Sequence, residues 1–207
     1  MCMKINTNHN QSFGCKRLYS AKIEKELRTG VKQVFDVFVS ELEKTDYDRI
    51  FNKNLAITQT KLGGQILTNF MSEAMKNAES EIGKGKRYLV IEAPTLPDEE
   101  RFLGIGLAEV FEKYIWISKL QSLKDEPKYK KFKGIGTSLM HAIIDIAKKN
   151  EKKCVALSSL PKAVNFYRNL SFFETIPMTL DLNLRFNRYD NVLKSTGDRF
   201  SIKSLNE

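Results

Sequence analysis

Cysteine is scarce in this sequence, and the positions of the few thiols exclude the common cysteine-based sites. Cys2, Cys15 and Cys154 are widely separated, and none belongs to a CxxC or CxH pair. Zinc sites and disulfide frameworks require ligands at short, characteristic spacings. We therefore expect three reduced thiols, no bound metal, and residence in a reducing compartment such as the cytoplasm.

Long hydrophobic runs are also missing. No segment approaches the roughly 18 consecutive apolar residues that a membrane-spanning helix requires. The first twenty residues carry no apolar stretch behind their charges, as a secretory signal peptide would. We therefore expect a soluble, cytoplasmic protein without a membrane partner.

Acidic residues are outnumbered, since 25 Asp and Glu stand against 34 Lys and Arg and give a formal net charge of +9. Such an excess favours an anionic partner, which could be nucleic acid, a membrane surface or a polyphosphate cofactor. A solvated basic surface without any partner explains the same charge. Charge alone therefore does not choose the function.

The 207 residues, 42% of them hydrophobic, suffice for one domain with a sizeable core, and no composition break divides 1–207. Apolar side chains recur at helical spacing in 24–43 and, more clearly, in 61–82. We predict a helix in each range. The polar segment between them is expected to be a loop.

The pattern then changes to aromatic and β-branched runs of strand length at 87–93, 101–111 and 113–123, which predict an antiparallel meander. The following elements are expected in this order: a helix after Gly136, a buried strand at 153–159, a short helix at 161–170, and a strand at 178–186. The polar end from 187 is expected to be loosely held.

A lysine-rich loop with two glycines, Gly134 and Gly136, runs directly into the predicted helix. A helix N-terminus exposes four unpaired amides and carries about half a positive charge, and glycine lets the backbone approach a ligand closely. The loop therefore predicts a pyrophosphate cradle. It lacks the Gly-Lys-Ser/Thr ending of a P-loop and the third glycine of a dinucleotide-binding fingerprint.

A second pair of glycines, Gly104 and Gly106, lies inside the predicted strand 101–111. No helix follows this pair, so phosphate binding is not expected there. A bulge or tight packing is the better explanation.

Two motifs in this order resemble the GNAT superfamily of N-acetyltransferases. Lys131, Gly134 and Gly136 are similar to its Q/R-x-x-G-x-G/A acetyl-CoA signature, and Phe166, Tyr167 and Phe172 are similar to its F-Y-x-x-x-G-F segment. Ser171 replaces the glycine of the second motif, and Lys131 replaces glutamine or arginine in the first. The resemblance covers about 87–180.

The resemblance implies an α/β (α+β) fold in which helices flank a mixed, mostly antiparallel central sheet that is splayed between its fourth and fifth strands. Acetyl-CoA would bind where the strand at 119–123 separates from the strand at 153–159. The implied contacts come from the strand backbone at Gln121, Ser122 and Leu123, and from the loop residues Lys131, Phe132, Lys133, Gly134, Ile135, Gly136 and Thr137.

The resemblance gives Tyr167 the task of protonating the departing thiolate. Trp116 stands where the lysine-acetylating branch of the family has a glutamate base, so we take Glu109 as the candidate base. Glu109 falls on the apolar face of its strand, where a carboxylate is unexpected, although an exposed strand end explains it equally well.

These observations predict an acetyl-CoA-dependent N-acetyltransferase acting on a primary amine, either a small molecule or a protein lysine. Two alternatives stay open: a basic nucleic-acid-binding protein, and a non-catalytic acyl-CoA-binding module on the same fold. The sequence contains no recognised nucleic-acid-binding motif, which disfavours nucleic acid. A homodimer is left open.

Overall fold

The computed structural model describes residues 16–26, 29–43, 46, 61–78, 85–97, 101–123, 132–172, 178–181 and 203–204. The strands are β1 (Lys16–Glu26), β2 (Lys32–Glu41), β3 (Lys86–Glu92), β4 (Phe102–Val110), β5 (Tyr114–Ser122), β6 (Phe132–Lys133), β7 (Cys154–Leu157), β8 (Met178–Asp181) and β9 (Lys203–Ser204). The helices are α3 (Lys61–Ala78), α4 (Ile135–Lys149) and α5 (Val164–Asn169), and a 3-10 turn, η3 (Pro161–Ala163), precedes α5.

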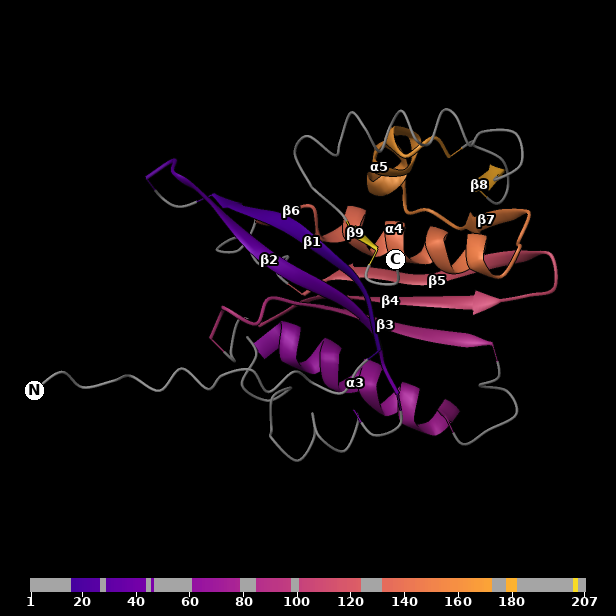
Figure 1. Ribbon diagram of the computed structural model, residues 1–207, viewed down its shortest axis with the longest axis horizontal. Coiled ribbons are helices and arrows are strands. Elements are labelled where there is room, and N and C mark those ends of the chain that lie inside the picture. The colour runs from indigo at the N-terminus through magenta and orange to yellow at the C-terminus, as the bar shows by residue number, and fades with distance from the viewer. Residues whose placement is uncertain are drawn as a thin grey trace, which may run out of the picture.

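These strands form one sheet in the order β6-β1-β2-β3-β4-β5-β7-β8, with β9 paired to β1. Neighbouring strands are antiparallel except β5 and β7, which run parallel. Helix α3 covers one face of the sheet, and α4 lies on the opposite side with α5 beyond it (Figure 1). The predicted mixed, mostly antiparallel sheet flanked by helices is confirmed.

The sheet separates two apolar clusters, which we name by the helix that covers each. The α4-side core joins α4 to the inner faces of β1, β2 and β7, and the α3-side core joins α3 to β3 and β4. Residues of the α3-side core are Leu42, Leu67, Phe70, Met71, Ala74, Tyr88, Val90, Phe102, Ile105, Leu107 and Leu123. Each strand between the helices therefore contributes alternate side chains to the two cores.

The helix predicted for 24–43 is wrong, because these residues belong to the antiparallel hairpin of β1 and β2. Its turn contains Gly30, whose φ of +78° suits glycine. Strand β2 buries Phe35, Val37 and Val39 with a period of two, whereas Val34, which fitted the helical spacing, is 55% exposed. β-Branched and aromatic side chains favour this extended form.

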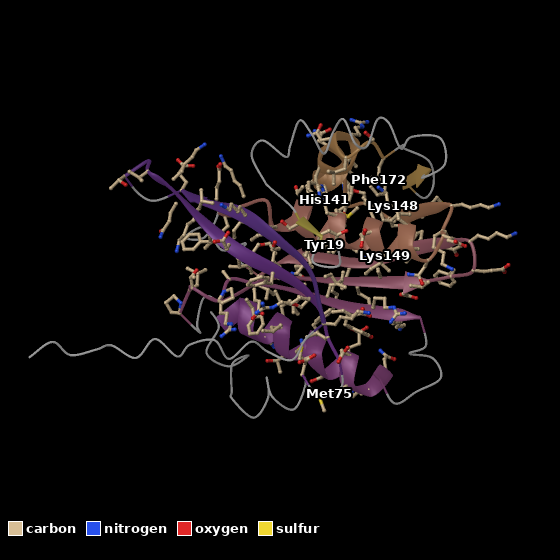
Figure 2. The ribbon with its side chains drawn as sticks, viewed as in Figure 1. Tyr19, Met75, His141, Lys148, Lys149 and Phe172 are labelled. Atoms are coloured by element: carbon tan, nitrogen blue, oxygen red, sulfur yellow. The ribbon has the colours of Figure 1, made fainter. Side chains whose placement is uncertain are left out.

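The helix predicted for 61–82 is confirmed as α3 up to Ala78, and 79–84 lie outside the described residues. It buries Leu67, Phe70 and Met71 against the sheet. Met75 lies on the side of α3 that faces away from the sheet, as Figure 2 shows. The helix is therefore amphipathic, as its apolar spacing predicted.

The predicted meander is confirmed as β3, β4 and β5, and β7 and α5 lie within their predicted ranges. Helix α4 is also present but begins at Ile135, before the predicted start after Gly136. Strand β8 accounts for the start of 178–186, whose remainder lies outside the described residues. One part of the C-terminal tail is not loosely held, since β9 pairs with Tyr19 and Ser20 of β1. The rest of the tail also lies outside the described residues.

His141 is a buried titratable residue on α4 (Figure 2). Burial, with a smaller contribution from the charge of Lys148, lowers the pKa of His141 from 6.5 to about 4. The folded protein therefore holds this imidazole neutral over a range in which the unfolded chain protonates it. Above pH 6.5 both states carry it neutral, and stability is lost as the pH falls from 6.5 towards 4.

We expect acidification from pH 7 to pH 4 to lower the free energy of unfolding by about 3 kcal/mol through this histidine. Urea denaturation of the wild type and of His141→Leu at both pH values measures the effect. The wild type should lose more stability on acidification than the variant. The other titrating groups are present in both proteins and contribute equally to the loss of stability. An equal loss in the wild type and in His141→Leu would therefore show that His141 does not contribute to it.

Candidate functional site

The site is organised by the separation of β5 from β7. The two strands pair only between Tyr114–Ile117 and Cys154–Leu157. Strand β5 continues to Ser122, and no other strand in the described part of the chain pairs with 118–122 on that side. We call this side of Ser118–Ser122 the open edge. It is the splay that the resemblance implied between 119–123 and 153–159.

A β-bulge at Ser118 accounts for the separation. Ala108 of β4 pairs with Ile117 and Leu107 pairs with Lys119, so Ser118 is an extra residue on β5. A bulge bends its strand and increases the local twist. Because the bulge directly follows the last residue paired with β7, the rest of β5 turns away from β7 there.

Backbone directions along β5 decide which groups reach the open edge. The amide of Leu123 donates to the carbonyl of Leu103 at 2.8 Å, so it faces β4. The carbonyl of Gln121 also faces β4, since it lies 3.1 Å from the position a Cβ would take at Gly104. Directions alternate along a strand, so the backbone groups of Leu120 and Ser122 face the open edge.

This corrects the predicted set of backbone contacts on β5. Of Gln121, Ser122 and Leu123, only Ser122 presents its backbone to the open edge. The amide of Leu123 is committed to β4, and Leu120 takes the place beside Ser122. Which backbone groups face the open edge depends on the alternation of directions along β5, and the extra residue at the bulge shifts this alternation by one residue.

The N-terminus of α4 has the features of an anion site. Gly134 is its N-cap in the left-handed region (φ +98°), no side chain caps the helix, and its first turn contains no acidic residue. The first intrahelical bond runs from the amide of Ser138 to the carbonyl of Gly134 at 2.9 Å. The amides of Ile135, Gly136 and Thr137 precede that bond, where helix N-termini stabilise phosphate.

Gly104 fixes this helix end beside β5. A Cβ at Gly104 would lie 2.6 Å from Cγ2 of Ile135, so only glycine lets the first residue of α4 sit on β4. The register of β3 and β4 also shifts next to it, since Ile91 pairs with Gly104 and Glu92 with Phe102. The bulge or tight packing expected for the two glycines of β4 is therefore found at Gly104, whereas a Cβ at Gly106 would make only ordinary contacts, the nearest at 3.6 Å from Cδ2 of Leu139. The open edge and the α4 amides are therefore neighbours.

Helix α5 lies against the first turn of α4. A Cβ at Gly136 would meet the ring of Phe166 at 3.1 Å, a close contact that a larger residue could make only if the ring moved. Ser171, which replaces the glycine of the second motif, still adopts a left-handed φ of +66°. The turn geometry of that motif is therefore present despite the substitution.

Tyr167 is buried beside this contact. Its ring makes edge-to-face contacts with Phe166 and Phe172, at centroid distances of 5.0 and 5.7 Å. Burial raises the pKa of the Tyr167 phenol above 10.0, so the hydroxyl is protonated at neutral pH. The group can donate a proton but cannot serve as a base there.

Glu109 lies beside the bulge. The hydroxyl of Ser118 donates to Oε1 of Glu109, and Glu109 pairs across the strands with Trp116. The carboxylate is partly exposed on the α3 side of the sheet. It is therefore attached to the residue at which β5 and β7 part, a more specific position than an exposed strand end.

Polar groups that sequence reasoning missed surround this position on the α3 side. Burial, followed by the charges of Glu73 and Glu109, raises the pKa of the Tyr88 phenol, which accepts a 2.6 Å hydrogen bond from the amide of Asn77. Ser118 itself had a sequence signal. The aliphatic residues of β5 are Ile115, Ile117 and then Leu120, and the final spacing of three indicates a bulge.

The remaining predicted contacts have other surroundings. Phe132 and Lys133 form β6, and Thr137 is half-buried in the first turn of α4. Lys131 lies outside the described residues. Four lysines, at 148, 149, 152 and 153, lie at the other end of α4. Two of them make polar contacts, since Lys149 pairs with Asp145 at 2.8 Å and Lys152 donates to the carbonyl of Glu112.

The described residues contain no group of three or more His, Cys, Asp or Glu side chains placed to hold a metal ion. None of their helices is both long enough and apolar enough to cross a membrane.

The chain matches no protein-family model and no curated protein. Among solved structures it is similar to an acetyltransferase from Trypanosoma brucei, with 20% identity over 68% of this chain and 94% of that one and a TM-score of 0.44. It is also similar to the PaiA N-acetyltransferase from Thermoplasma acidophilum in complex with coenzyme A (14% identity, 70% and 98%, TM-score 0.45).

A third similar structure is the spermidine/spermine N-acetyltransferase SpeG from Vibrio cholerae, with 15% identity over 75% of this chain and 96% of that one and a TM-score of 0.48. At such identities and TM-scores, the activity has to be argued from this chain's own residues. Many of the solved structures that resemble this chain are GNAT-family N-acetyltransferases.

Proposed function

We propose that the protein is an acetyl-CoA-dependent N-acetyltransferase that acts on a primary amine by direct attack in a ternary complex. One observation carries the proposal: the open edge of β5 lies beside the uncapped N-terminus of α4. An amide-containing arm that ends in phosphates complements both features. The arm can add to the strand edge, and the phosphates can accept from the helix amides.

The residues that would hold this donor follow from the backbone directions. Leu120 and Ser122 present backbone groups to the arm, and Ile135, Gly136 and Thr137 present amides to the phosphates. The amide of Leu120 is the first after the bulge to face the open edge, which suits it to the carbonyl oxygen of the thioester. A positioned donor of this kind typically contributes ~3 kcal/mol in acyl transfer.

The donor supplies an acetyl thioester, and the protein supplies position and proton transfer. The amine nitrogen attacks the carbonyl carbon, so that a C–N bond forms while the C–S bond breaks. Glu109 accepts the proton that the amine loses, and Tyr167 donates a proton to the departing sulfur. Holding both substrates together would provide most of the acceleration, and each proton transfer typically contributes ~10² to 10⁴ in rate.

Acetyl-CoA should raise the melting temperature of the protein, because a ligand that binds only the native state stabilises it. At 100 times the dissociation constant the stabilisation is about 2.7 kcal/mol. Thermal denaturation with acetyl-CoA, with CoA and with a short DNA duplex in parallel measures the shift. We expect a shift with both CoA species and a smaller one with DNA.

A large, salt-sensitive shift with DNA and none with any acyl-CoA would overturn the proposal in favour of nucleic-acid binding. Catalysis is tested separately by thiol release from acetyl-CoA with spermidine and with a lysine peptide as acceptors. A clear acetyl-CoA shift without release for any amine would identify a binding module instead of an enzyme. Substitution of Gly136 is a poor test, since it would displace Phe166.

A further inference from the structure

The segment just before the α4 N-terminus is held by the N-terminal hairpin. Strand β6 pairs with β1, so that Phe132 lies opposite Lys25 and Lys133 lies opposite Glu24. Gly134, the N-cap of α4, follows β6 directly. In Figure 1 the hairpin of β1 and β2 extends past the rest of the sheet on the side where β6 lies.

The side chain of Phe132 is held between two residues of that hairpin. Its ring centroid lies 6.4 Å from that of Phe35 on β2, with the planes tilted by 44°. The ammonium of Lys25 on β1 lies over the same ring, 5.0 Å from its centroid. Phe35 is itself buried, and Phe132 packs against the α4-side core. The contact between Phe132 and the hairpin is therefore continuous with the α4-side core.

The helix end is thus fixed from two sides. Gly104 of β4 seats Ile135, and the hairpin holds Phe132, three residues earlier. Only Lys133 and the left-handed Gly134 lie between these two points. The direction in which the amides of Ile135, Gly136 and Thr137 point therefore depends on the hairpin as well as on the central sheet.

We propose that the β1–β2 hairpin is a positioning element for the phosphates of the donor, with Phe35 and Lys25 acting through Phe132. This inference rests on the proposed function. A donor that must reach both the open edge and the helix amides binds well only if the distance between them is preset. The hairpin sets that distance. It should therefore control affinity for the phosphate-bearing part of the donor and leave chemistry at the thioester unchanged.

Two acetyl donors separate positioning from general stability. Acetyl-CoA carries the phosphates, and acetyl-pantetheine carries the thioester arm without them. Phe132→Ala should raise the Kd and KM for acetyl-CoA about tenfold, equivalent to about 1.4 kcal/mol. It should leave kcat at saturation and the KM for acetyl-pantetheine within about twofold of the wild type.

Matched variants show whether the effect comes from the hairpin. Phe35→Leu and Lys25→Gln should weaken the binding of acetyl-CoA without weakening that of acetyl-pantetheine. Lys25→Arg should bind acetyl-CoA as the wild type does, because a guanidinium also sits well over an aromatic ring. Phe111→Ala is the control, since Phe111 is a half-exposed ring stacked on Tyr114 at the turn between β4 and β5. This variant should change the KM for neither acetyl donor.

Equal weakening of both donors, or unchanged acetyl-CoA affinity in Phe132→Ala, would overturn the inference. A wild-type protein that binds neither donor would overturn the proposed function instead. Hydrogen–deuterium exchange then still tests the hairpin. Phe35→Leu should speed exchange of the Phe132 to Gly134 amides, and unchanged exchange would show that the hairpin does not hold them.

Discussion

Replacement of Tyr167 by phenylalanine should lower kcat by roughly 10² to 10⁴ and leave the acetyl-CoA thermal shift unchanged. The substitution removes only the hydroxyl, so the ring keeps its contacts with Phe166 and Phe172. Because burial raises the pKa of the phenol, the wild-type group stays protonated throughout the pH range of an ordinary assay. A thiolate leaving group gains most from a donor in that state.

Steady-state kinetics with acetyl-CoA and a primary amine, together with the melting temperature, measure this prediction. An unchanged kcat and pH profile in a well-folded Tyr167→Phe protein would show that the ring is only packing. Phe172→Leu is a useful comparison, since it alters the same aromatic group without removing a proton donor. It should affect stability more than kcat.

Glu109→Gln should lower kcat/KM by about 10² near pH 6.5 and by much less near pH 9. At the lower pH the acceptor amine is mostly an ammonium ion and must lose a proton before it can attack. Near pH 9 a far larger fraction of the amine is already neutral, so the reaction depends less on a protein base. The amide keeps the size and an oxygen acceptor for Ser118, so acetyl-CoA binding should not change.

Glu73→Gln is the matched control for Glu109, because both carboxylates raise the pKa of Tyr88. Glu73 lies on α3 and contacts Lys119 at 4.0 Å, and it has no bond to the bulge residue. We expect the dependence of kcat/KM on pH in Glu73→Gln to resemble that of the wild type. If Glu109→Gln also gives the wild-type profile, water is the base and Glu109 only orients Ser118.

The hairpin of β1 and β2 shows why helical spacing alone misled the prediction for 24–43. Val31, Val34, Phe35 and Phe38 satisfy a helical period, yet Phe35, Val37 and Val39 satisfy a period of two equally well. The structure buries the second set and exposes Val31 and Val34. Residue type was the better guide here, since β-branched and aromatic side chains dominate the run.

The loop before α4 was easier to predict than the strand beside it. Gly134 carries a local requirement for a left-handed backbone, and glycine at this position is visible in the sequence, whereas the packing of Gly136 against Phe166 comes from α5 and is not. The backbone contacts on β5 depend instead on how β5 pairs with β4, and this pairing cannot be read from the residues of β5 alone. The predicted contacts Gln121, Ser122 and Leu123 are consecutive, and consecutive residues of a strand present their backbone groups to opposite edges, so only Ser122 of the three faces the open edge.

The bulge at Ser118 also determines which change in the length of β5 the sheet tolerates. Leu120 packs against the α4-side core, and Lys119 lies on the other face, where its ammonium is 5.9 Å from the ring centre of Phe70. Because Ala108 pairs with Ile117 and Leu107 pairs with Lys119, deletion of Ser118 would keep both pairs and both faces and would remove only the bend. Loss of this one residue should therefore reduce the separation of β5 from β7 without disturbing either core.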